Sequence, residues 1–224
     1  QHPLGRRVAR TLGLPQPVLL RRRQDAWSNK ELSGRAVLAI APGSVSPSPS
    51  LLSGIASLGG ADSGSGPVHT LVYNAGTGTW GTVEEITPAI LEGAFRVNTM
   101  GLLVCAQQAI PAMKARREGN IIVIGSTASR RGVARTAAFA PAKAAQRSLV
   151  ESMARHLWPQ RVHVALIIVD GIVDLPTARA FMRDKPDDFF IQPDAVAETA
   201  YRLTTQPSSA WSFEVEARPF GESW

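Results

Sequence analysis

The sequence FAPAK, residues 139–143, places a lysine four residues after an aromatic ring. Side chains at this spacing share one face of a helix, so the ring of Phe139 and the ammonium group of Lys143 lie next to each other. Phenylalanine has no exchangeable proton, so the ring of Phe139 cannot take part in acid–base chemistry.

Other polar positions follow apolar runs that are typical of buried strands. The sequence NAG at residues 74–76 ends one run, Ser126 ends the next, and Asn98 lies in the helical stretch between them. Because parallel strands deliver their carboxyl ends to one edge of a sheet, we expect these groups to meet the start of the 139–158 helix there. Each residue also has a structural interpretation: Gly76 suits a tight turn, Ser126 a turn or cap, and Asn98 a bond to its own helix.

Apparent strands and helices alternate along the chain, which predicts an α/β fold with a mostly parallel sheet. Continuous apolar runs such as IIVI and ALIIV agree, because parallel strands are usually buried on both faces. The expected strands cover residues 35–41, 69–76, 120–126, 162–171 and 210–217. The expected helices cover residues 50–58, one or two segments of 87–117, 139–158 and 195–204. We expect a basic arm at residues 1–34 and a single domain at residues 35–224.

The segment from Val72 to about Asp174 resembles the short-chain dehydrogenase/reductase family. The matching features are NAG, the asparagine of VNTMG, a serine thirteen residues before the aromatic residue, the aromatic-xxx-Lys pair and a strand leading to DG. Each feature is weak alone, and their order and spacing carry the resemblance. It implies a Rossmann-like, doubly wound parallel sheet.

The resemblance also implies roles for individual residues. The family's tetrad of Asn, Ser, Tyr and Lys falls on Asn98, Ser126, Phe139 and Lys143. In a working member the tyrosine donates a proton to the carbonyl oxygen, serine binds that oxygen, asparagine positions a water and lysine holds the nicotinamide ribose. Here the ring of Phe139 fills the tyrosine slot without its chemistry. Lys143 is then either a ribose ligand or a lysine on the helix surface.

The segment after the first expected strand departs from the family pattern. It reads PGSVSPSP at residues 42–49, where the family has TGxxxGxG. Aligned on Gly43, the two later glycines become Pro47 and Pro49. Proline has no N–H to offer a pyrophosphate, and its ring opposes the tight turn. We therefore expect no bound NAD(P) cofactor.

The same region is short. One βαβ unit takes ~30 residues or more, so the chain between Gly43 and His69 cannot hold the family's second and third strands with their helices. The prediction is a reduced sheet without those two strands. Asn74, Gly76 and Lys143 would then be a remnant of the cofactor site.

The formal net charge of +6 is concentrated at one end of the chain. Residues 1–35 hold eight Lys or Arg and two acidic residues, and the remainder is balanced. Such an arm can contact RNA, an anionic membrane surface or an acidic protein, and it can also be a solvated tail. An Arg-rich start on a chain that begins with Gln1 is compatible with organelle import, so we expect an organelle matrix, the mitochondrial matrix being the example.

Composition excludes several other classes of site. The single cysteine, Cys105, allows no internal disulfide, and the four histidines show no metal-ligand spacing, so we expect no metal. No apolar run approaches the ~18 residues that a membrane helix needs. A soluble or peripherally attached protein is the expectation.

Two losses indicate a protein without the family's activity, since the sequence lacks both the tyrosine that donates the proton and the glycines of the phosphate-binding loop. The leading hypothesis is a pseudoenzyme that serves as an accessory or structural subunit of a larger assembly of protein subunits. The first alternative is an active NAD(P)-dependent oxidoreductase with an atypical site, which cofactor binding would reveal. The second is an RNA- or ribosome-associated protein that uses its basic arm, which salt-sensitive binding would reveal.

Overall fold

The computed structural model describes residues 36–40 and 67–222 of the chain. The main sheet has five strands in the order β1-β2-β3-β4-β7. These strands are β1 (Ala36–Ile40), β2 (Val68–Tyr73), β3 (Gly119–Ile124), β4 (Val162–Val169) and β7 (Glu214–Ala217). Every neighbouring pair is parallel, which confirms the predicted α/β fold.

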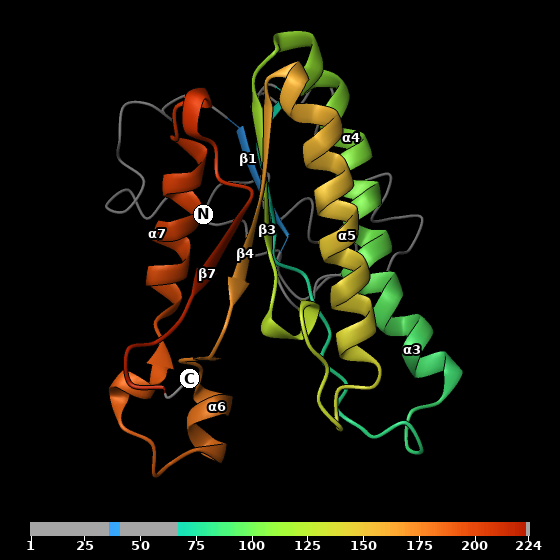
Figure 1. The fold of residues 1–224 in the computed structure, drawn as a ribbon, viewed down its shortest axis with the longest axis vertical. Helices are drawn as coiled ribbons and strands as arrows, with labels where there is room; N and C mark the ends of the chain where they lie inside the picture. Colours follow the sequence, from blue (N-terminus) through green and yellow to red (C-terminus); the bar gives the residue numbers. More distant parts are fainter. Residues whose placement is uncertain (1–35, 41–66, 223–224) are drawn as a thin grey trace, which may run out of the picture.

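Helices cover both faces of this sheet, as Figure 1 shows. On one face lie α3 (Pro88–Phe95), α4 (Gly101–Arg116) and α5 (Phe139–Leu157), whereas α7 (Pro193–Thr204) covers the other face. In β4 every residue except the last is buried. This two-sided burial is the physical reason for the uninterrupted apolar runs in the strands.

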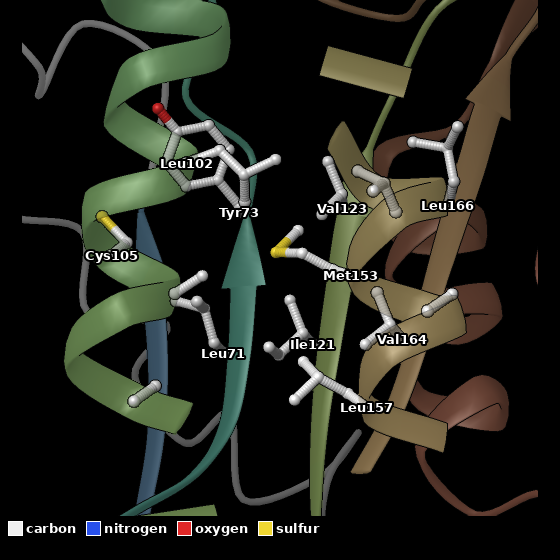
Figure 2. Packing of buried hydrophobic residues seen from close by; sticks show 14 of the residues in the cluster. Leu71, Tyr73, Leu102, Cys105, Ile121, Val123, Met153, Leu157, Val164 and Leu166 are labelled. Atoms are coloured by element: carbon white, nitrogen blue, oxygen red, sulfur yellow. The ribbon is translucent and has the colours of Figure 1, made fainter. Parts of the chain in front are cut away.

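The larger part of the core lies between the sheet and the layer formed by α4 and α5 (Figure 2). Ile121 of β3 packs in this cluster together with Leu157 of α5. The next strand residue, Ile122, points to the opposite face and packs in a second cluster with Leu203 of α7. Because successive strand residues alternate between the faces, a slip of one residue would exchange the two clusters, and burial therefore fixes the register.

A π-helical turn, Arg96–Met100, joins α3 to α4. The hydroxyl of Tyr73 in β2 donates a hydrogen bond to the carbonyl oxygen of Val97 in this turn. Gly101 follows directly, and a Cβ atom there would overlap the Tyr73 hydroxyl. Because residue 101 is a glycine, Tyr73 of β2 can make this hydrogen bond to the π-helical turn. Asn98 is part of the same turn.

The helical stretch from Pro88 to Arg116 spans 29 residues and is, by length and composition, apolar enough to cross a membrane. The sequence analysis considered only uninterrupted apolar runs, whereas average hydropathy tolerates single polar residues such as Asn98. In the most apolar 18-residue segment of this helical stretch, 33% of the residues are buried within the fold. Leu102 and Met113 belong to the core. A core helix of a globular domain meets the same criterion, so the feature is weak evidence for a membrane span.

A small second sheet lies beside the main one and was not predicted. It consists of β5 (Ile172–Val173) and β6 (Phe190–Ile191), with α6 (Pro176–Phe181) between them in sequence. Arg179 makes a bidentate pair with Asp174 at 2.7 and 2.9 Å and also donates to Asp187 at 2.7 Å. Strands of two residues have no detectable periodicity, so only the structure could reveal them.

Within the described residues, the predicted strands and helices are confirmed, with ends that differ by a few residues. The largest difference is the last strand, which begins at Glu214 because residues 208–210 form a 3₁₀ turn. Among the described strands, β1 is an edge strand of the main sheet and pairs only with β2. The arm, the predicted helix at 50–58, the proline-containing loop and the segment expected to lack two strands lie outside the described residues.

Candidate functional site

The carboxyl ends of β2 and β3 and the first turns of α5 meet at one edge of the sheet. The ammonium group of Lys143 connects them. Its Nζ atom donates to the carbonyl oxygen of Ile124 at 3.1 Å, and it lies 3.8 Å from the position that a Cβ atom would take on Gly76. The structure thus brings Lys143 of α5 to the ends of both strands, as the sequence predicted for this edge.

Lys143 is only 5% exposed. Besides Ile124, its Nζ donates to Oε1 of Gln146 at 2.9 Å, and both acceptors are uncharged. Burial lowers the pKa of Lys143 to about 8. This position excludes a solvated lysine on the helix surface, which was one interpretation of the sequence. An ammonium group has three donors, so one N–H remains beyond these two bonds.

Asn98 is completely buried. Its Nδ2 donates to the carbonyl oxygens of Ala94 at 2.9 Å and Thr77 at 3.3 Å, and the bond to Ala94 is the one that the structural interpretation expected. Its Oδ1 atom has no hydrogen-bond partner among the described residues. The backbone carbonyl of Asn98 accepts from Nε2 of Gln146 at 2.7 Å, so Gln146 links Asn98 to Lys143.

Gly76 leaves a space between these two polar groups. A Cβ atom built there would lie 3.4 Å from Oδ1 of Asn98 and 3.8 Å from Nζ of Lys143. Gly76 itself is half-buried, and Asn74 at the rim is exposed. A buried acceptor without a partner among the described residues and an ammonium group therefore flank the position that a Cβ atom on Gly76 would take.

Phe139 and Trp80 form an aromatic pair beside the lysine. Their ring centroids are 6.3 Å apart at an interplanar angle of 37°, and Nζ of Lys143 lies 5.9 Å from the Phe139 centroid. Trp80 is 61% exposed. A hydrogen bond from the amide of Gly81 to the carbonyl of Arg135, at 2.8 Å, holds the Trp80 loop against the segment that leads into α5.

Ser126 lies two residues after the end of β3 and is half-buried. Its Oγ atom accepts from the amide of Ala128 at 3.3 Å and caps the short 3₁₀ helix Thr127–Ser129. This is the cap role that the sequence had left as one interpretation. The hydroxyl proton is not needed for that bond and remains able to donate.

Sequence reasoning missed Gln146, Trp80 and the acidic residue that ties β7 to the site. Glu214 accepts from Arg130 at 2.7 Å and from Arg147 at 2.6 Å, so it joins the loop after Ser126 to α5. Gln146 stands three residues after Lys143, on the same helix face, and this spacing was the available signal. No comparable signal exists for Trp80 or Glu214, whose contacts depend on the folding of distant segments.

A parallel sheet covered by helices on both faces, with a polar site at its carboxyl edge, defines an α/β protein of the Rossmann-like class. A sequence model described as short chain dehydrogenase matches residues 55–185, more than half of the chain. This chain belongs to the short-chain dehydrogenase/reductase family.

Individual relatives agree with this assignment. The chain is 32% identical over 102 residues to "Retinol dehydrogenase 8" of Bos taurus, which is 46% of this chain and 33% of that protein. It is 33% identical over 156 residues to "3-dehydrosphinganine reductase" of Danio rerio, covering 66% of this chain and 47% of that protein. A metagenomic short-chain oxidoreductase solved in complex with NADP matches at 29% identity and a TM-score of 0.61, covering 76% of this chain and 71% of its own.

The chain thus spans between a third and a half of the length of these curated relatives. One half of a dinucleotide site can be assessed directly. The remaining N–H of Lys143 and the Oδ1 of Asn98, which has no partner among the described residues, are a donor and an acceptor of the kind that the hydroxyl groups of a ribose need. Residues 42–49, which the sequence analysis aligned with the pyrophosphate loop, lie outside the described residues.

Proposed function

We propose that this chain is a catalytically degenerate short-chain dehydrogenase that serves as an accessory subunit of a larger protein assembly. The observation that carries the proposal is the phenyl ring of Phe139, which stands one turn before Lys143 beside the lysine ammonium. A hydride delivered to a carbonyl carbon leaves an alkoxide that needs a proton. Phe139 cannot supply it, and loss of a general acid typically costs ~10²–10⁴-fold in rate.

A second feature of the sequence supports the same proposal. Pro47 and Pro49 replace glycines in the segment where the family's backbone amides hold the cofactor pyrophosphate. If NAD(P) were bound, it would supply the hydride. Lys143 would hold its ribose, and Ser126 would orient a substrate oxygen. None of these side chains replaces the missing phenolic proton at the position of Phe139.

The proposed partners are protein subunits, with the basic arm against an acidic neighbour, and the proposed location is an organelle matrix such as that of mitochondria. The net charge of +6 in residues 1–35 supports an acidic partner by charge complementarity. Native purification of the tagged full chain should recover stoichiometric protein partners. Recovery of the chain alone, as a soluble monomer, would argue against the subunit role.

The catalytic half of the proposal has its own experiment. The full chain and the Phe139→Tyr variant are mixed with NADPH and a panel of ketones and aldehydes, and oxidation of the cofactor is followed by absorbance. We expect neither protein to exceed the uncatalysed rate, because the tyrosine restores the proton donor but not the phosphate loop. Turnover by the variant alone would show that the cofactor half is intact and that only the donor was lost.

An active oxidoreductase with an atypical site is the second candidate function. The retained cluster of Asn98, Gln146 and Lys143 at the sheet edge favours it, because this cluster suits a cofactor ribose. Turnover by the unmodified chain in the same assay would select this candidate. Association with RNA through the arm remains a third proposal, and it predicts binding that weakens steeply with salt and is lost without residues 1–34.

A further inference from the structure

We propose that the amino edge of the main sheet, where its strands begin, binds an acidic segment of a partner protein. The residues that contact this segment are cations that form no ion pair within the described part of the chain: Lys114, Arg116, Arg117 and Arg161. The inference rests on the proposed subunit role and adds to it the surface and the chemistry of the partner.

The parallel topology brings two of these cations together. Arg117 follows α4 and stands two residues before β3, and Arg161 directly precedes β4. The first residues of these strands, Gly119 and Val162, are paired in the sheet. Figure 1 shows the α4–β3 and α5–β4 connections next to each other at one end of the molecule, with α6 at the other end. The two arginines therefore stand at the starts of neighbouring strands.

Arg116 extends this group of cations to the start of β2. Its Nη2 donates to the carbonyl oxygen of Val68 at 2.8 Å, whereas its Nη1 is shielded from solvent and has no hydrogen-bond partner among the described residues. Shielded N–H groups normally have an acceptor, and a carboxylate from a partner can provide it. The basic residues 1–35 enter the sheet at this same edge, because β1 begins at Ala36, which pairs with Val68.

Most other arginines have a carboxylate partner. Nine of the thirteen arginines in the described segments form ion pairs. The four that do not are Arg116, Arg117, Arg161 and Arg183. Three of these four lie at the amino edge, beside the exposed Lys114 and against one neighbouring carboxylate, Glu118. This excess of positive charge attracts an anionic ligand.

Arg117 and Arg161 share an unusual backbone conformation. Their φ angles are 54° and 63°, and no other non-glycine residue in the described segments has a positive φ. This left-handed region favours glycine, because a Cβ atom there crowds the backbone. Both side chains are exposed and make no hydrogen bond or ion pair with the described residues that would offset the cost. Strained residues of this kind are concentrated at functional sites.

The surroundings favour protein carboxylates over nucleic acid or a membrane. Single-stranded nucleic acid usually stacks its bases on accessible aromatic rings. The two tryptophans near this edge, Trp158 and Trp211, instead pack on His163, with ring centroids 6.0 and 4.8 Å away. The two most exposed large apolar side chains of the described residues, Phe181 and Phe220, belong to the part of the fold around α6, so they do not supply a membrane anchor here.

The test is a fluorescence-anisotropy titration of the full chain with a labelled twenty-residue peptide of alternating glutamate and serine, at pH 7 and low salt. The variant Arg117→Gly/Arg161→Gly removes two charges, and glycine suits both backbone conformations, so the fold should be retained. The loss of two exposed ion pairs should raise the dissociation constant by about fivefold or more. The control Arg183→Ala/Lys185→Ala removes the same charge from exposed positions near α6 and should change it by less than about twofold.

Three results would overturn the proposal. The unmodified chain could fail to bind the peptide, the glycine variant could bind it unchanged, or the control could lose as much affinity, which would make net charge the explanation. An RNA oligonucleotide with as many charges as the peptide, and vesicles that contain phosphatidylserine, are titrated in parallel. Tighter binding of either one, with a loss in the glycine variant, would assign the surface to that partner and also overturn the proposal. The peptide titration needs no natural partner, so it can fail while native purification still recovers protein subunits, and the reverse.

Discussion

The contact between Tyr73 and Gly101 should limit the stability of the fold, because it fixes the helical turn that carries Asn98. In a Gly101→Ala variant, the new Cβ atom overlaps the Tyr73 hydroxyl but lies at ordinary distances of 3.5 Å from Cζ and 3.4 Å from the carbonyl of Arg96. The hydroxyl is thus the only serious obstacle. Tyr73 is fully buried, so its ring cannot move away without disturbing the core.

The expected cost follows from three terms. Overpacking costs about 1–3 kcal/mol, and losing the Tyr73 hydrogen bond to Val97 costs about 1 kcal/mol. Replacing glycine by alanine inside a helix returns about 1 kcal/mol. We expect Gly101→Ala to lower the free energy of unfolding by about 2 kcal/mol, as measured by urea denaturation at constant m-value.

A double-mutant cycle separates this mechanism from general damage. Tyr73→Phe alone should cost about 1 kcal/mol, and the double variant should be no less stable than Tyr73→Phe, because removal of the hydroxyl makes room for the methyl group. The matched control is Gly93→Ala, whose Cβ meets nothing within 4 Å and which should be neutral or slightly stabilising. Additive costs, or a Gly101→Ala variant as stable as the control, would refute the reasoning.

Two further predictions concern charge and pH. Burial lowers the pKa of His163, although two backbone carbonyls beside the ring oppose this shift. The unfolded chain therefore binds a proton at higher pH than the folded chain, so the contribution of His163 is complete above about pH 6.5 and is lost as the pH falls further. Denaturation midpoints should decrease less on acidification in His163→Leu, and an unchanged slope would contradict this. Asp170→Asn should cost about 3 kcal/mol in urea denaturation, because Asp170 and Arg218 form a pair of which both side chains are nearly buried. Glu92→Gln, which breaks the exposed pair with Arg96, should cost less than about 0.5 kcal/mol. If both substitutions lowered the free energy of unfolding equally, burial would not determine the contribution of an ion pair.

Most of the sheet could be predicted from the sequence because its strands are apolar on both faces. The run at residues 162–169 contains no charged residue and is buried almost throughout. The small sheet of β5 and β6 could not be predicted, since two-residue strands depend on contacts between distant segments, such as the bond from the amide of Asp174 to the carbonyl oxygen of Ile191 at 2.8 Å. The segment from Pro88 to Arg116 was predicted to contain one or two helices, but its π-helical turn was not predicted, because a tyrosine from β2 binds that turn.

The candidate site shows a similar division. The positions of Asn98, Ser126, Phe139 and Lys143 near one sheet edge follow from strand ends and helix spacing. The burial of Lys143 and its bond to the carbonyl oxygen of Ile124 could not be derived, because both depend on packing between α5 and β3. The roles of these residues stay predictions.

The central claim is that this chain has lost the dinucleotide-dependent chemistry of its family, and calorimetric titration of the full chain with NADPH tests it most directly. The account predicts no saturable heat of binding, and therefore no dissociation constant below ~1 mM, because Pro47 and Pro49 replace two glycines of the family pattern when the sequence is aligned on Gly43, and proline has no N–H to donate. A dissociation constant of ~1 μM, about 8 kcal/mol of binding free energy, would contradict it.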